Sequence, residues 1–168
     1  DVVFPVAQLA SATLDLQELH YLFKPLTMVL AIVLVIQRGA PDPVAGRGAQ
    51  RLLLAALTAS LAGDVFLMLP VNAFIPGLAS FLVAHLFYLA LFHNGQGWFA
   101  NRAALVLALA FGAAMLAFLW NGLGDPALKI AVTLYVTVIC LMAAQAIGRA
   151  TVLRNRSAML VATGACVF

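Results

Sequence analysis

Charged residues are scarce in this sequence: aspartate, glutamate, lysine and arginine make up only 9% of its 168 residues. A soluble domain carries roughly a quarter of such residues. Hydrophobic residues make up 65%, and a chain this apolar could not cover its own surface in water. The scarcity of charge therefore excludes an ordinary soluble domain. The net charge of +3 is small, and the basic residues form short clusters between apolar runs, which favours membrane topology over nucleic-acid binding.

Cysteine and histidine are also few, with two and three residues respectively. Cys140 and Cys166 lie inside apolar runs, and we interpret them as buried thiols in preference to a disulfide or a reactive site. His20 and His93 are expected at opposite ends of the membrane from each other, so neither can join His85 in a zinc site. Glycine-rich phosphate loops and Gly-x-Ser-x-Gly elbows are missing from the sequence. We therefore expect neither a metal nor another cofactor.

Long apolar runs account for most of the chain. A membrane-spanning helix needs about 20 apolar residues; four runs meet this length cleanly and a fifth is slightly shorter. A short apolar run at each end is interpreted as part of a further spanning helix, with a half-inserted or interfacial helix as the alternative. The sequence thus predicts an all-α transmembrane bundle forming a single integral-membrane domain over residues 1–168. The five complete spans are Tyr21–Gln37, Leu52–Leu69, Phe74–Phe92, Ala103–Trp120 and Leu128–Ile147, and the two partial ones are Val2–Leu14 and Ser157–Phe168.

The basic residues lie in alternate connections between these runs. Gln37–Arg51 and Gly148–Arg156 carry three arginines each, and His93–Arg102 carries one. Pro70–Ala73 and Asn121–Pro126 carry no basic residue. Because arginine and lysine accumulate on the cytoplasmic side of membrane proteins, we expect the arginine-bearing connections to be cytoplasmic loops of a multi-pass protein in a bacterial inner membrane.

Small residues recur at every fourth position in two of the runs. This spacing allows helix backbones to approach closely in lipid, where packing rather than hydrophobicity drives association. We interpret both stripes as helix-packing surfaces. They consist of Ala55, Ala59 and Gly63 in one run and Ala104, Ala108 and Gly112 in the other.

Asp64 is the only acidic residue within a spanning run. A carboxylate in this position costs at least ~2.5 kcal/mol on insertion scales, so a compensating function is expected. Ser60 shares its helix face. His85 lies midway along the next run, about 16 Å deep, with Tyr88 on the same face. A short outer turn makes the two helices antiparallel neighbours, so Asp64 and His85 are predicted as catalytic residues lining one cavity. The alternative is that both residues only stabilise helix packing.

Two further residues are candidates for contacts with a substrate. Lys24 begins its helix at the expected outer interface, where its ammonium could hold a phosphate, although a lysine there can also simply extend into water. Tyr135 lies about 10 Å inside the outer end of its run. Its hydroxyl could donate a hydrogen bond into the same cavity, although tyrosine is more often a packing residue. With Tyr88, these residues form the predicted substrate-binding set.

Several of these residues belong to motifs that resemble the YhhN-like lysoplasmalogenase family. The order and spacing also match, Tyr135 and Met142 sit where that family carries a tyrosine and a methionine, and the resemblance covers nearly the whole chain. The motifs are His-Tyr-Leu-Phe-Lys-Pro-Leu-Thr at 20–27, Ser-Leu-Ala-Gly-Asp-Val-Phe-Leu-Met at 60–68, Phe-Leu-Val-Ala-His-Leu-Phe-Tyr at 81–88 and Thr-Gly-Ala-Cys-Val-Phe at 163–168.

The resemblance implies an eight-helix membrane fold, whose final helix and a second acidic residue are expected after Phe168. It also implies hydrolysis of the vinyl-ether bond of lysoplasmalogens, so that the partners would be a lysophospholipid and the bilayer. Such a reaction needs a proton on carbon and then water on the resulting oxocarbenium ion. A neutral buried carboxyl can supply the proton and an ionised one can activate the water. Asp64 would be one of the two, in either role.

Two other classes of protein remain open at this stage. Asp64 and His85 could form a proton or ion relay in a small transporter, since intramembrane acids and histidines are common in relays. Against this, the chain has no inverted repeat and no pair of broken helices in matching positions. The third reading is a structural membrane subunit in which Asp64 only fixes helix packing.

The orientation is open to a direct test. In a background without the two native cysteines, single cysteines at Gly46 and Asn155 should be protected from a membrane-impermeant thiol reagent in intact cells. Cysteines at Asn72 and Gly124 should react, because they lie in connections without basic residues. The opposite labelling pattern would reverse the orientation.

Overall fold

The computed structural model describes residues 23, 25–39, 45–69, 73–95 and 97–167. Within these residues the secondary structure is entirely helical, which confirms the predicted all-α polytopic bundle. The expected partial span Val2–Leu14 lies outside the described residues. The helices are Pro25–Arg38, α2 (Ala45–Met68), α3 (Phe74–His93), α4 (Arg102–Leu119), α5 (Pro126–Leu153) and α6 (Arg156–Val167).

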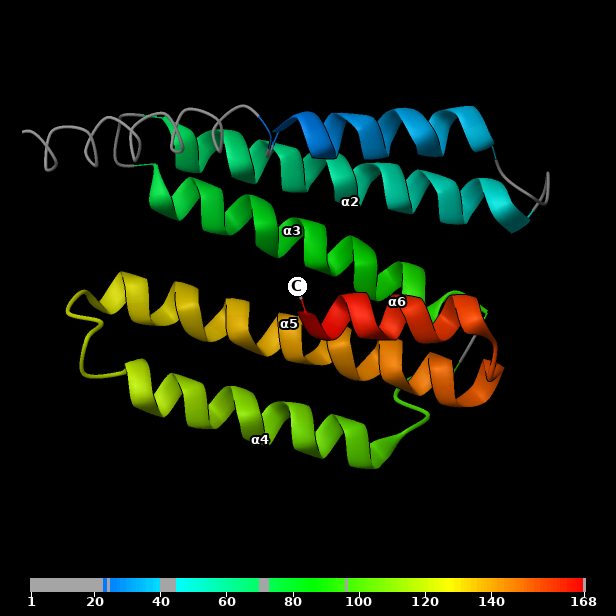
Figure 1. Ribbon diagram of the computed structural model, residues 1–168. Helices are drawn as coiled ribbons and strands as arrows, with labels where there is room; N and C mark the ends of the chain where they lie inside the picture. Colours follow the sequence, from blue (N-terminus) through cyan, green and yellow to red (C-terminus); the bar gives the residue numbers. More distant parts are fainter. Residues whose placement is uncertain (1–22, 24, 40–44, 70–72, 96, 168) are drawn as a thin grey trace, which may run out of the picture.

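Four of the helices, α2 to α5, are long and apolar enough to cross a membrane, as expected. The described part of the first predicted span is the shorter helix Pro25–Arg38, and the residues that precede Phe23 in that span are outside the described set. The helix α6 is also short, in agreement with the partial span expected there. It turns back along α5 and ends near the middle of the bundle (Figure 1).

The helices extend beyond the apolar runs at the arginine-bearing side. We expected a loop over Gln37–Arg51, but α2 already begins at Ala45. At the other connection, α5 continues through Arg149 to Leu153 before Arg154 turns the chain with a φ of 48°. The loop boundaries predicted from hydropathy were therefore wrong here. Hydropathy marks where the hydrocarbon ends, whereas backbone hydrogen bonds let a helix continue into the polar interface.

The long helix α5 is the centre of the bundle. It packs against α3, α4 and α6, while α2 covers the opposite side of α3 (Figure 1). The helix Pro25–Arg38 lies along α2, and the Gln50 side chain donates a 3.0 Å hydrogen bond to the Val35 carbonyl oxygen across that pair. The site-bearing helices α2, α3 and α5 are therefore consecutive neighbours in space.

Polar residues begin three of the helices. Asn101 and Asn155 accept hydrogen bonds from the backbone N–H three residues later, at 3.0 Å and 2.8 Å. Asp125 accepts one from Ala127 at 3.1 Å, and Pro126 follows it in the first turn of α5. These side chains satisfy N–H groups that have no partner within the helix. The residues at each helix start therefore determine where that helix begins.

Two residues of α5 hold the connection between α3 and α4. The buried Gln145 side chain accepts a 2.7 Å hydrogen bond from the Phe99 N–H and donates one to the Gly97 carbonyl at 3.1 Å. One turn further along, Arg149 donates to carbonyl oxygens at the end of α3. These belong to Leu91, Phe92 and Asn94, at 3.2, 3.5 and 3.4 Å. Arg149, predicted only as a topology signal, thus also caps α3.

The glycines that end the two small-residue stripes lie at close helix contacts. A Cβ added to Gly63 would lie 2.7 Å from the ring of Phe81 on α3, and one added to Gly112 would lie 2.5 Å from Sγ of Cys140 on α5. Real Cβ contacts are longer than this, so an alanine at either position would force the neighbouring side chain to move. These contacts place Gly63 at the packing surface between α2 and α3 and Gly112 at that between α4 and α5.

Replacing Gly112 by alanine should destabilise the bundle by about 1–3 kcal/mol, the usual cost of overpacking. In Gly112→Ala/Cys140→Ala the sulfur is gone, so part of the loss should be recovered. Gly164→Ala is the matched control, because nothing lies within 4 Å of a Cβ there. Thermal unfolding in detergent measures all variants. Equal stability of the two single glycine variants would refute the close α4–α5 contact.

Candidate functional site

The described part of the bundle buries several polar side chains completely. His85, Gln145 and Ser60 are its largest fully buried side chains, and Asp64 is 6% exposed. Large apolar side chains point outward instead, with Phe118 83% exposed. This inverted arrangement is expected in a bilayer, where apolar side chains face lipid and polar ones face other helices.

Contacts between α2 and α3 show which parts of the two helices lie against each other. Gly63 lies against the ring of Phe81. Further along the pair, the Tyr88 hydroxyl approaches Ser60, although no hydrogen bond of ordinary geometry joins them. His85 lies between Phe81 and Tyr88 along α3. Because the two helices are antiparallel, His85 is therefore level with the part of α2 between Ser60 and Gly63.

Asp64 lies next to this level, one turn beyond Ser60 on the same helix face. Its side chain is buried, as the sequence led us to expect. Lys24, the predicted phosphate-binding residue, is outside the described residues. Four of the five predicted site residues can therefore be located: Asp64, His85, Tyr88 and Tyr135 are all on the three neighbouring helices α2, α3 and α5.

His85 is held by contacts on two sides. Its Nδ1 donates a hydrogen bond to the Phe81 carbonyl oxygen one turn earlier. Its ring meets that of Tyr135 edge to face, with centroids 5.3 Å apart and planes at 84°. Tyr135 belongs to α5, so a third helix completes the site. The hydrogen bond at Nδ1 sets the tautomer and directs Nε2 away from the backbone of α3.

Apolar cavities adjoin this polar site on the side of α5 and α6. A cavity of about 240 Å³ is lined by Tyr88, Phe92, Met142, Gly164 and Ala165. The cavity depends on side chains from three helices, α3, α5 and α6, so no single stretch of sequence predicts it. The tyrosine at its wall is the same Tyr88 that approaches Ser60.

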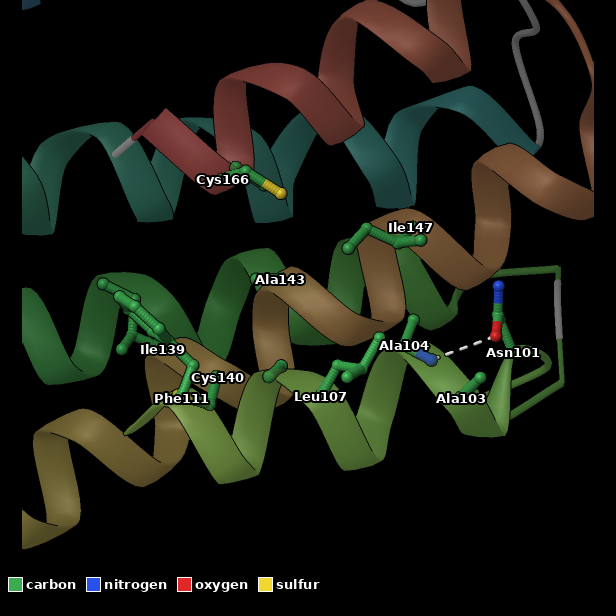
Figure 2. A pocket seen from close by; sticks show the side chains of 12 residues that line it. Asn101, Ala103, Ala104, Leu107, Phe111, Ile139, Cys140, Ala143, Ile147 and Cys166 are labelled. Atoms are coloured by element: carbon green, nitrogen blue, oxygen red, sulfur yellow. Dashed lines mark hydrogen bonds between the residues drawn. The ribbon is translucent and has the colours of Figure 1, made fainter. Parts of the chain in front are cut away.

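A second cavity, of about 530 Å³, lies between α4, α5 and α6 (Figure 2). It shares Ala165 with the smaller cavity. Its wall is almost wholly apolar and includes both cysteines. Small residues on the facing helices leave this space open. The alanines repeated along α4 are the feature of the sequence that could have indicated the cavity. The lining residues are Asn101, Ala103, Ala104, Leu107, Ala108, Phe111, Ile139, Cys140, Ala143, Ile147, Ala165 and Cys166.

The described residues contain no group of three histidine, cysteine, aspartate or glutamate side chains that could hold a metal ion. The arrangement that they do contain combines a buried carboxyl group, an imidazole and two phenols beside an apolar cavity. It can transfer protons, orient a small polar group and accommodate a hydrocarbon chain.

The fold and this site define a polytopic α-helical membrane protein with polar side chains buried between three helices. A model of the YhhN family matches residues 19–168, and the chain belongs to that family. It is 30% identical over 106 residues to the uncharacterized membrane protein YhhN of Escherichia coli O6:H1, of Escherichia coli O157:H7 and of Shigella flexneri. The match covers 63% of this chain and 49% of each relative, so the chain spans about half the length of these curated relatives. No solved structure shows significant similarity.

The contact between His85 and Tyr135 should be measurable in the stability of the protein. Tyr135→Phe keeps the edge-to-face ring pair, whereas Tyr135→Leu removes it and should lower the free energy of unfolding by about 0.5–1.5 kcal/mol. Phe118→Leu serves as the control, because it removes an aromatic ring from the lipid-facing surface. If Tyr135→Leu unfolds at the same temperature as Phe118→Leu, the ring pair makes no contribution.

Proposed function

We propose that this protein is a membrane hydrolase that cleaves the vinyl-ether bond of lysoplasmalogens, which are 1-alkenyl-glycerophospholipids. The products would be a fatty aldehyde and the glycerophospho-head group. The observation that carries the proposal is the buried carboxyl group of Asp64, one turn from Ser60 and close in level to His85. The same residues lie in the motifs at 60–68 and 81–88 that resemble the lysoplasmalogenase family.

The chemistry suits a buried acid. A carboxyl group kept neutral by its apolar surroundings donates its proton to the outer carbon of the vinyl-ether double bond. Water then adds to the resulting oxocarbenium carbon and loses a proton to an ionised carboxylate. The hemiacetal that forms breaks its bond to the glycerol oxygen, which regains a proton as the aldehyde leaves. Asp64 is one of these acids, and the resemblance places the second one after Phe168.

The depths of these side chains in the membrane suit a substrate that has one polar and one apolar end. Asp64 lies about 9 Å from the outer end of the predicted span, and His85 and Tyr88 are successively farther from the outer end of α3. The apolar cavity beside Tyr88 and Met142 continues in the same direction. A lysophospholipid would then place its head group near Lys24, its vinyl ether beside Asp64 and its hydrocarbon chain in the cavity.

The test is hydrolysis of a lysoplasmalogen by purified Asp64→Asn protein. The amide keeps the shape but cannot donate or accept the proton in the reaction, so aldehyde release should fall by at least ~10²-fold. Insertion and thermal stability should be retained, because a neutral amide costs less in lipid than a charge. Asp125→Asn is the matched control, since Asp125 is an exposed helix cap and asparagine caps equally well.

Near-normal turnover by stable Asp64→Asn protein would remove Asp64 from the reaction and leave it a packing role. A wild-type protein that releases no aldehyde, yet conducts protons or ions in liposomes without lipid cleavage, would favour the relay function instead. Lysophospholipid cleavage that survives in Asp125→Asn and disappears in Asp64→Asn is the result that the hydrolase proposal requires.

A further inference from the structure

The hydroxyl side chains of α2 to α5 follow one pattern with a single exception. In lipid, a serine or threonine usually hydrogen-bonds to a carbonyl oxygen of the preceding turn. Five of the six such residues in these helices do so. They are Thr58, Ser80, Thr133, Thr137 and Thr151, with distances of 2.8, 3.0, 2.7, 2.8 and 2.8 Å.

Ser60 is the exception, and it is also the most buried of the six. Its side chain is fully buried, and Oγ makes no hydrogen bond. A buried hydroxyl without a partner is costly, and in native proteins such a group usually serves an ordered water or a ligand. Thr58, two residues earlier on the same helix, bonds to the carbonyl oxygen of its preceding turn, whereas Ser60 does not.

The surroundings of Ser60 indicate what it binds. Tyr88 on α3 brings a second hydroxyl close to it, Asp64 follows one turn later on the same face, and His85 is bracketed at the same level. A bound water needs two to four polar partners, and the two hydroxyls provide them beside the groups assigned to the chemistry. Neither hydroxyl carries a charge, so the pair can orient water without taking its proton.

We propose that Ser60, together with Tyr88, binds the water molecule that attacks the oxocarbenium ion. This role rests on the proposed hydrolase function. The water oxygen forms the new bond to the carbon that carries the ether oxygen, and the released proton passes to the carboxylate that acts as the base. Ser60 holds the water in place and undergoes no change of its own.

The experiment compares Ser60→Ala with Ser80→Ala. Both variants lose one hydroxyl, but that of Ser80 is bonded to its own helix. Ser60→Ala should lower kcat for lysoplasmalogen hydrolysis by about 10-fold to 100-fold, because the water is no longer positioned. KM and the pH at which the rate is half-maximal should stay unchanged, since neither substrate contacts nor titrating groups are altered. Its melting temperature should stay close to that of the wild type, because the Ser60 hydroxyl makes no hydrogen bond to another group of the protein.

The outcomes separate this role from the hydrolase function itself. If the wild type cleaves lysoplasmalogen and Ser60→Ala is as active as Ser80→Ala, the water-binding role is wrong and the hydrolase function stands. If Ser60→Ala melts below Ser80→Ala, the Ser60 hydroxyl is bonded within the folded protein and the role is again wrong. If the wild type cleaves nothing, the proposed function fails and this role fails with it.

Discussion

Hydrocarbon offers no hydrogen bonds, and this constraint governs the whole structure. Apolar side chains gain nothing from leaving lipid, so residues such as Phe118 remain on the outside. Polar side chains instead face other helices, and His85, Gln145 and Ser60 are the largest fully buried side chains among the described residues. The bundle therefore encloses a polar site beside an apolar core around Phe92 and Met142, and each buried polar residue is a candidate for function.

The central helix α5 connects the different parts of the molecule. In its first half Tyr135 packs against His85, and five residues later Cys140 fills the space beside Gly112. Towards the arginine-bearing end, Gln145 and Arg149 hold the connection between α3 and α4. Because these contacts come from one rigid element, the position of the tyrosine at the site depends on the same packing that orders the opposite end of the bundle.

The two kinds of space beside α3 suit the two ends of an amphiphile. Between α2 and α3 the available groups are a carboxyl, an imidazole and hydroxyls, whereas around Met142 and Ala165 the cavities are apolar. Tyr88 belongs to both, because its hydroxyl lies near Ser60 and the residue also lines the smaller cavity. In the proposed reaction, this residue would lie where the polar bond to be cleaved meets the hydrocarbon chain.

The sequence alone determined the class of fold, the spans α2 to α5, and which polar residues, Asp64 and His85, lie within the spans. These features are local, because hydropathy over one run identifies a span and helical periodicity puts Tyr88 on the same face as His85. Only the tertiary structure decided that α5 lies beside α3, which brings Tyr135 to His85, and that the Ser60 hydroxyl has no bond within its own helix. In lipid the outer surface of a bundle is as apolar as its packing surfaces, so the hydropathy pattern does not tell which helices are neighbours. Helix neighbours, the ends of α2 and α5, and the cavities beside α6 follow from side-chain shape and hydrogen bonding across helices, which sequence spacing does not encode.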